Sequence, residues 1–336
     1  MRLRNVGLAI AGIVTVALAV TGCSETGSSS GSTSAGGSAA ATSCTKAAPS
    51  TVASPSAAAS SAAASSAPAA ASSAASSAPA ASGSAAGLVD KGKGGTLTIG
   101  VKFDQPGLGL KSADGTMSGF DVEVAKYVAK KLGVEESGIT WKETPSAQRE
   151  TALQNQEVDF IVATYSITDK RKQVVDFAGP YFIAHQDLLV KSDNTSICGP
   201  NDLNGKLLCS VKGSTSAQRI KDTFASEVQL KEYGGYSDCV QALKTGAVDA
   251  VTTDDVILAG YAAQSPNDYK VVGNGFSDEN YGVGIHKGDT AGTAAVAAAL
   301  TEMISDGSWE KALTDTVGPS GYTIPSPPTP SAQSGS

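Results

Sequence analysis

The chain has 336 residues, of which 41% are hydrophobic and 5% are aromatic, and its formal net charge at pH 7 is −7. An acidic chain with no basic patch is a poor candidate for binding nucleic acid, because such binding depends on clustered lysine and arginine. The two histidines and five cysteines show no metal-ligand spacing, so we expect no metal site and no cofactor.

The N-terminus is typical of an export signal that ends in a lipidation site. Arg2 and Arg4 form a basic start, residues 6–20 form an apolar run too short for a comfortable membrane span, and small residues precede Cys23. We expect residues 1–22 to be a lipoprotein signal peptide and Cys23 to carry a lipid anchor at the extracytoplasmic face of the cell membrane. The alternative is an ordinary secretory signal with an incidental cysteine.

Two segments have compositions typical of disorder. Residues 23–93 consist largely of Ala, Ser and Gly, and they offer too little apolar surface to offset the entropy lost on ordering. We expect them to form a flexible tether between the membrane and a folded body. Residues 318–336 are rich in proline, and we expect a second disordered end there.

The chain between these segments alternates strand patterns with helix patterns. Strands are predicted over residues 96–101, 139–141, 158–163, 188–190, 207–211, 228–233 and 248–252. Helices are predicted over residues 120–132, 146–154, 214–224 and 237–244. Such alternation predicts α/β lobes built on mostly parallel sheets.

An internal similarity indicates two lobes of related construction. Residues 156–164 resemble residues 245–253, and each segment follows a helix pattern and places Val-Asp at the entry of a strand. Ligands of open α/β sheets bind beyond the carboxyl ends of the strands. Two facing lobes would therefore bring residues 164–171 and 253–255 into one cleft.

The segment from Ala163 to Arg171 combines short hydroxyl side chains with a guanidinium. Ser166 and Thr168 offer donors, and the planar fork of Arg171 matches a carboxylate with two parallel hydrogen bonds. A loop of this kind can bind a small anion. The alternative is a capped helix start, with Thr168 as the N-cap and Arg171 exposed to solvent.

Several motifs together resemble one protein family. They are Gly119-Phe-Asp-Val122, Ser166-Ile-Thr-Asp-Lys-Arg171, Asp176-Phe-Ala-Gly-Pro-Tyr181, Asp202-Leu-Asn-Gly-Lys206 and Gly246-Ala-Val-Asp249. The resemblance is to the family 3 extracellular solute-binding proteins of polar amino acid ABC transporters, and it covers nearly all of residues 95–317. It implies a two-lobed α/β fold of the periplasmic-binding-protein type II, or Venus flytrap, with two hinge strands.

The resemblance also implies domain boundaries and a mode of action. Lobe 1 would comprise residues 94–183 plus 281–317, and lobe 2 residues 184–280, with crossings near residues 183–186 and 280–282. The protein would be a monomer that binds an amino acid between its lobes and docks on ABC permease subunits, with no enzymatic activity of its own. The alternatives are a lyase or dehydratase on the same fold, using Glu143 or Asp104, and a surface domain that senses amino acids.

A narrower resemblance concerns the ligand. Residues 101–109, 145–150, 209–218 and 251–254 look like the glutamate-binding lipoproteins of Gram-positive glutamate importers. The likeness implies capture of L-glutamate, although aspartate and glutamine remain open.

Binding an amino acid without water needs a cation, an anion and several neutral donors. The family pattern implies Arg171 for the α-carboxylate, and Asp254 rather than Asp255 for the ammonium. Thr164 and Ser166 would add donors from lobe 1. Ser214 and Thr215 would add donors at a helix N-terminus in lobe 2, although they fit plain helix capping as well.

A second carboxylate on the ligand would need a further cation. We expect Lys102 in this role first and Arg149 second, although either fits a surface charge. Phe103 and Tyr165 would form an apolar wall around the ligand, unless they are ordinary packing residues.

Three cysteines lie in the expected second lobe, where an extracytoplasmic location allows a disulfide. Cys209 is predicted on a strand, and Cys239 on a helix that packs over that strand. We predict a Cys209–Cys239 disulfide, with Cys198–Cys209 as the alternative.

Overall fold

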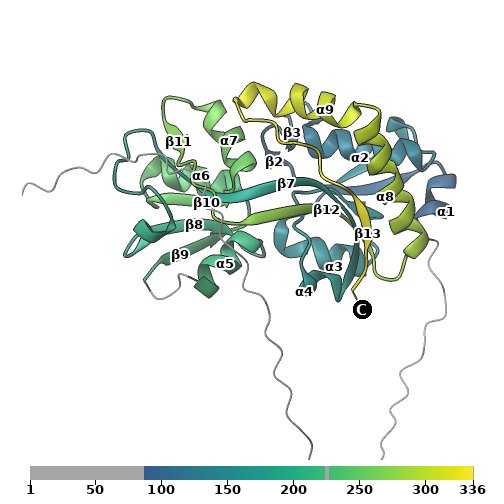
Figure 1. The fold of residues 1–336 in the computed structure, drawn as a ribbon, viewed down its shortest axis with the longest axis horizontal. Coiled ribbons are helices and arrows are strands. Elements are labelled where there is room, and N and C mark those ends of the chain that lie inside the picture. The colour runs from purple at the N-terminus through teal and green to yellow at the C-terminus, as the bar shows by residue number, and fades with distance from the viewer. Residues whose placement is uncertain (1–86, 224–226, 336) are drawn as a thin grey trace, which may run out of the picture. The chain divides into compact units, whose positions relative to one another are not determined.

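The structure, a computed structural model, describes residues 87–223 and 227–335 (Figure 1). The predicted signal peptide, Cys23 and nearly all of the tether lie outside the described residues. Within the described part, ten strands form one sheet in the order β5-β1-β6-β12-β7-β10-β8-β9, with β11 and β13 also paired to β7. Three short strands, β2, β3 and β4, form a second sheet.

Lobe 1 surrounds the first half of the large sheet. Its elements are α1 (Leu88–Lys93), β1 (Leu97–Val101), β2 (Asp104–Gln105), β3 (Gly109–Lys111), β4 (Met117–Ser118), α2 (Phe120–Lys131), η1 (Glu136–Gly138), β5 (Ile139–Glu143), η2 (Ser146–Gln148), α3 (Arg149–Gln154), β6 (Phe160–Ile161), α4 (Asp169–Lys172), α8 (Thr290–Ser305) and α9 (Ser308–Thr316). β1 pairs in parallel with β5 and β6, as the strand–helix alternation predicts. Ile99, Val101 and Phe120 are fully buried in the core that this sheet and α2 share.

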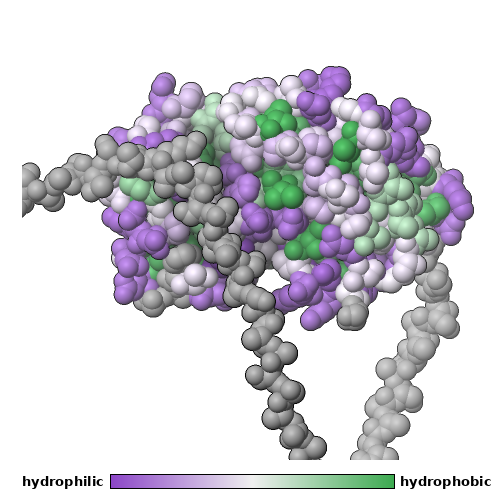
Figure 2. All heavy atoms as spheres, in the orientation of Figure 1, coloured by the Kyte–Doolittle hydropathy of each residue, from purple (hydrophilic) through white to green (hydrophobic). Residues whose placement is uncertain are grey.

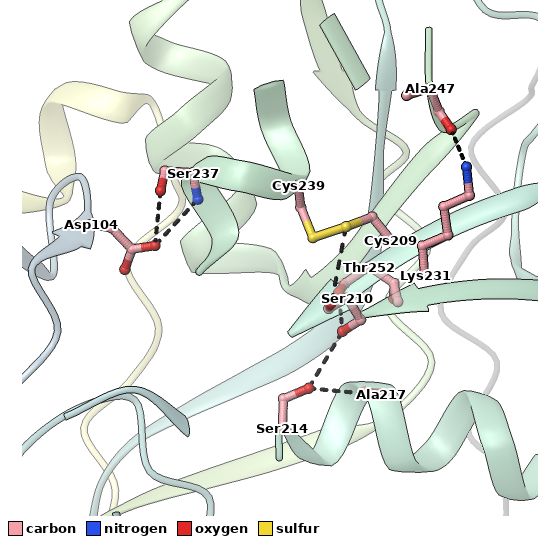
Figure 3. The surroundings of a disulfide bond; sticks show 10 residues. All are labelled: Asp104, Cys209, Ser210, Ser214, Ala217, Lys231, Ser237, Cys239, Ala247 and Thr252. Carbon is pink, nitrogen blue, oxygen red and sulfur yellow. Dashed lines mark hydrogen bonds between the residues drawn. A yellow bond between two sulfur atoms is a disulfide. The ribbon is translucent and has the colours of Figure 1, made fainter. Parts of the chain in front are cut away.

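Lobe 2 surrounds the second half of the sheet. Its elements are η3 (Pro200–Leu203), β8 (Leu207–Val211), α5 (Thr215–Thr223), β9 (Gln229–Tyr233), α6 (Tyr236–Thr245), β10 (Ala250–Asp254), α7 (Asp255–Gln264) and β11 (Tyr269–Val271). β8 pairs in parallel with β9 and β10. The disulfide between Cys209 on β8 and Cys239 on α6 confirms the predicted pair and excludes the Cys198–Cys209 alternative (Figure 3).

Two antiparallel strands connect the lobes. β7 (Val175–Lys191) pairs with β12 (Asp278–His286) along its first part and with β10 along its last part. The expected two-strand hinge and the type II fold are therefore present. The ladder between β7 and β12 shifts register between Tyr281 and Val283. A side chain at the intervening Gly282 would lie 2.7 Å from the side chain of Ile167, so glycine here lets residues 163–171 pack closely on this strand.

The structure corrects the expected limits of both disordered segments. Residues 88–93, predicted as tether, form α1, where Leu88 N donates to Asp289 and Lys91 pairs with Asp159. Residues 318–335, predicted as a disordered tail, include η4 (Gly318–Ser320) and β13 (Ser331–Gln333), which pairs with β7. The disorder predicted from composition is wrong in both places, because a few hydrogen bonds and ion pairs are enough to fix a short segment of low-complexity sequence on a folded lobe.

Large hydrophobic side chains are rarely exposed on the described part of the chain. Val174 is the one large hydrophobic residue in this part whose side chain is exposed. Figure 2 shows hydrophobic residues on this face as small patches separated by hydrophilic ones. None of the helices in residues 87–223 and 227–335 is long and apolar enough to cross a membrane.

Candidate functional site

Arg171 is buried at the point where the two lobes meet, with 8% of its surface exposed. Its guanidinium donates to the carbonyl oxygen of Ser166 (2.7 Å), to Glu150 Oε1 (2.9 Å) and to the carbonyl oxygen of Gly213 in lobe 2 (3.0 Å). The solvent-exposed alternative for Arg171 is therefore wrong. The capping alternative for Thr168 is correct, since its hydroxyl accepts from Arg171 N at the start of α4.

The hydroxyl residues predicted from each lobe also meet. Ser166 Oγ lies 3.3 Å from Thr215 Oγ1, across the boundary between the lobes. Ser214 Oγ accepts from the backbone N–H of Ala217, so Ser214 caps α5 (Figure 3). A side chain at Gly213 would lie 2.6 Å from Cα of Ala147, so the loop before α5 packs directly on lobe 1. The structure thus has the lobes closed on each other.

Thr164 has a strained backbone in the lobe 1 loop that also contains Ser166 and Arg171. Its φ is 45°, a conformation that β-branched residues rarely adopt. Its N–H donates to Asp121 Oδ2 (2.8 Å), and the other oxygen of Asp121 accepts from Tyr181 (2.7 Å). Burial raises the pKa of Asp121 to about 6, although both hydrogen bonds oppose the shift. Asp121 therefore holds the loop in a conformation that the sequence of the loop alone does not favour.

Lys102 and Arg149 join Arg171 in one buried group of cations. Lys102 Nζ donates to Ser146 Oγ (2.8 Å), and Arg149 Nη1 donates to the carbonyl oxygens of Ala163 and Thr164. Burial, and then the charge of Arg149, lowers the pKa of Lys102 well below its usual value. Among the described residues, neither Lys102 nor Arg149 has a carboxylate within ion-pair distance, so a bound anion would stabilise the charged forms of both side chains.

Phe103 and Tyr165 were predicted to form an apolar wall, but the structure places cationic side chains on both rings. The ring of Tyr165 is buried and packs against two guanidiniums, with Cζ of Arg149 at 4.2 Å and Cζ of Arg171 at 4.9 Å from its centre. It is therefore a platform for cations more than an apolar wall. Phe103 is half-buried, and the ammonium of Lys111 lies 4.8 Å from the centre of its ring.

Asp254 ends β10 and is buried on the lobe 2 side of the site. It accepts hydrogen bonds from the hydroxyls of Tyr281 and Ser216. Burial, and then the charge of Glu279, raises the pKa of its carboxyl. Asp255, the alternative acid, instead bonds His185 and Tyr322 at the hinge, which favours Asp254 as the acid of the cleft.

The buried polar atoms that lack a hydrogen-bond partner gather at these residues. Within the described part of the chain Gln105 Nε2 and Arg149 Nε have no partner, whereas Tyr165 OH and Thr253 Oγ1 make no close hydrogen bond but interact with Glu150 and Tyr236. Gln105 accepts from Thr164 through its other amide atom, and Thr253 directly precedes Asp254. Buried polar atoms without partners are rare and destabilising, so their concentration here indicates a site for a polar ligand.

Some of these residues were not predicted from the sequence. Asp121 lies inside the motif Gly119-Phe-Asp-Val122 and Gln105 inside the segment 101–109, and both motifs were signals for them, whereas nothing in the sequence singled out Tyr281 as a site residue. Asp104, one of the two acids named for the enzyme alternative, accepts from Ser237 N and Oγ at the start of α6 and so joins the lobes (Figure 3). Asp104 is half-buried, and this contact gives it a structural role at the boundary between the lobes.

Two lobes, two connecting strands and a polar site between the lobes define a solute-binding protein of the Venus flytrap class. Residues 97–317 match the bacterial extracellular solute-binding proteins, family 3, and the chain belongs to this family.

The chain is 50% identical over 242 residues to the glutamate-binding protein GluB of Corynebacterium efficiens, which covers 69% of this chain and 82% of the relative. It is 40% identical over 216 residues to the glutamine-binding protein GlnH of Bacillus subtilis, covering 64% and 78%. An ancestral arginine-binding protein bound to glutamine matches the structure with a TM-score of 0.63 at 39% identity, covering 67% of this chain and 98% of that one. These relatives are binding proteins and not enzymes, in agreement with the sequence analysis.

Proposed function

We propose that the protein captures L-glutamate outside the cell and delivers it to the permease subunits of an ABC importer. One observation carries the proposal: buried cations and unpartnered polar atoms gather where the two lobes meet. The similarity to a glutamate-binding and a glutamine-binding protein supports an amino acid as the ligand.

The roles follow from the charges. Arg171 binds the α-carboxylate with two of its donors, and the ionised carboxylate of Asp254 accepts the ammonium. Thr164, Ser166 and Thr215 supply short donors around the α-carboxylate, and Ser214 orients the helix start beside it. Thr168 acts indirectly, since its hydroxyl caps the helix that carries Arg171.

The γ-carboxylate of glutamate is bound by Lys102. A lysine ammonium has three protons, and one is directed to Ser146. Arg149 is the second choice, because its Nη1 is already bonded to two carbonyl oxygens. The ring of Tyr165 packs against both guanidiniums, and Phe103 directly follows Lys102 at the end of β1.

Attachment and delivery complete the proposal. Cys23 carries the lipid anchor, and the protein acts as a monomer whose closed form docks on the permease. Mass spectrometry of the membrane fraction tests the anchor, because Cys23→Ala should release an unlipidated protein.

Titration calorimetry against glutamate, aspartate, glutamine, asparagine and arginine tests the ligand. We expect one-to-one binding that is tightest for glutamate. Preference for a neutral or basic amino acid would contradict the role of Lys102, and no binding to any of the five would contradict the proposed function.

A further inference from the structure

The segment after α9 is attached to lobe 2 near its beginning. Tyr322 OH donates to Asp255 Oδ2 (3.0 Å), at the first residue of α7. The same carboxylate accepts from the backbone N–H of His185 on β7 (3.0 Å). The ring of Tyr322 lies 6.3 Å from that of Phe182, also on β7. Tyr322 therefore joins the segment to both lobe 2 and the connecting strand.

The segment is attached to lobe 1 near its end. β13 pairs antiparallel with β7, with Ser331 opposite Gly179 and Gln333 opposite Phe177. Gln333 Nε2 donates to the carbonyl oxygen of Gly179 (3.0 Å), and Lys287 Nζ donates to that of Gly335 (3.0 Å). Figure 1 shows the segment, in yellow, running from α9 across the connecting strands to β13.

We propose that residues 318–335 form a strap that holds the two lobes together across the hinge and raises the affinity for the ligand. Both attachments are formed in a conformation whose lobes are closed, as Arg171–Gly213 and Ser166–Thr215 show. Opening rotates α7 relative to the lobe 1 half of β7, so it loosens one attachment or strains the chain between them.

Contacts made only in the closed state increase the fraction of closed protein, and the apparent affinity rises with that fraction. The effect on affinity rests on the proposed function, whereas the effect on closure does not.

Two variants test the strap. Tyr322→Phe removes the hydroxyl that reaches Asp255 and keeps the ring on Phe182. A chain ending at Ser320 removes both attachments. Tyr127→Phe is the matched control. It also removes a hydrogen bond between a tyrosine and a carboxylate, but Tyr127 OH donates to Asp306 within lobe 1, so this bond does not connect the two lobes.

We expect Tyr322→Phe to raise the Kd for glutamate by about two- to tenfold, because the closed state loses one hydrogen bond. The truncation should raise the Kd further. Tyr127→Phe should leave the Kd unchanged. In small-angle X-ray scattering without ligand, Tyr322→Phe and the truncated chain should have a larger radius of gyration than the wild type. With saturating ligand, the difference should disappear.

Unchanged affinity and an unchanged radius in both Tyr322→Phe and the truncated chain would overturn the proposal, and so would tighter binding in either. If the truncated chain does not fold, Tyr322→Phe decides alone. If the wild type binds none of the five amino acids, the proposed function fails, but scattering of the ligand-free proteins still tests the strap.

Discussion

The guanidinium of Arg171 and the carbonyl oxygen of Gly213 are joined by a hydrogen bond of 3.0 Å that crosses from lobe 1 to lobe 2. The same guanidinium is bonded to Ser166 and Glu150 within lobe 1. Burial alone would raise the pKa of Glu150, but the charges of Arg149 and Arg171 outweigh it and lower that pKa. The arginine is thus fixed by an ionised partner at the position where closure brings the lobes together.

Replacing Arg171 by lysine tests whether the fork itself is needed. Arg171→Lys keeps the charge but cannot bond a carboxylate through two parallel donors. We expect binding of every amino acid to weaken by about 2–5 kcal/mol, which is roughly 30-fold to several thousand-fold in Kd. Calorimetry with the five amino acids measures this loss.

Lys172→Met is the control for Arg171→Lys. Lys172 lies on the same helix and pairs with Asp169, whose side chain is 97% exposed. Its removal lowers the net charge of the loop without touching the cleft, so affinity should be unchanged. Equal losses in the two variants would show that the weaker binding of Arg171→Lys is not specific to the loss of the guanidinium fork.

Lys102 should distinguish an acidic ligand from its amide. Lys102→Met removes the ammonium and keeps a side chain of similar length in a site that is 4% exposed. We expect the affinity for glutamate to fall at least about tenfold, because its γ-carboxylate would be buried without a compensating cation. The affinity for glutamine should fall much less. Comparable losses for both ligands would exclude Lys102 as the reader of the γ-carboxylate, and Arg149→Lys would then be the variant to titrate.

Two fully buried glutamines offer a matched comparison. Gln186 is satisfied at both ends, since its amide nitrogen donates to Ser216 and Thr252 and its oxygen accepts from Arg219. Gln105 has an amide nitrogen with no partner. Removing Gln186 leaves its partners unpaired, whereas the hydroxyl of Thr164, which donates to the oxygen of Gln105, keeps the carbonyl oxygen of Ala163 as an acceptor.

We therefore expect the same substitution to affect stability at Gln186 and ligand binding at Gln105. Gln186→Leu should lower the free energy of unfolding by about 1–3 kcal/mol, whereas Gln105→Leu should change it by less than about 1 kcal/mol and weaken ligand binding. Thermal unfolding and calorimetry on both variants measure the two quantities. Full affinity in Gln105→Leu would mean that its amide does not reach the ligand.

The sequence predicted contacts that are local and failed for those that depend on distant segments. The helix pattern over residues 120–132 and the strand pattern over residues 96–101 agree with α2 and β1 to within one residue. The strand predicted over residues 188–190 is the end of β7, which continues through Pro180, a residue that would normally argue against a strand.

The candidate site shows the same limit. Arg171 and Thr168 lie within one loop, and their pattern could be read directly. Asp121 reaches Thr164 across 43 positions, and Gln105 reaches it across 59, so neither pair has a local signal. β13 is missed for the same reason, because a free edge of β7 decides that a proline-rich tail becomes a strand.

Ligand binding should weaken as the pH falls below neutrality, because Asp254 must be ionised to accept an ammonium. Burial and the charge of Glu279 raise its pKa, so protonation begins at a higher pH than for an ordinary aspartate. The free energy of unfolding should depend on pH in the opposite direction. Because the carboxyl pKa of Asp254 is higher in the folded protein than in the unfolded chain, protonation of Asp254 favours folding. This contribution to stability is lost as the pH rises through the pKa of the folded protein.

Glu279→Gln tests this cause. Removing the charge lowers the pKa of Asp254, so the loss of affinity should begin at a lower pH than in the wild type. Glu232→Gln is the control, since Glu232 pairs with Lys221 in the same lobe. Calorimetric Kd values over a pH series measure both, and an identical acid limb in wild type and Glu279→Gln would exclude Glu279 as the cause.

The disulfide between Cys209 and Cys239 should contribute to the stability of lobe 2. It closes a loop of 30 residues, which in the chain-entropy model stabilises the fold by about 3–4 kcal/mol. At about 2–4 °C per kcal/mol for a domain of this size, Cys209→Ala/Cys239→Ala should lower the melting temperature by roughly 6–16 °C. Val240→Ala, which trims a half-buried neighbour on α6, controls for the lost side-chain volume. A double variant that melts within about 2 °C of this control would show that packing of α6 on β8, and not the covalent link, holds the two elements together.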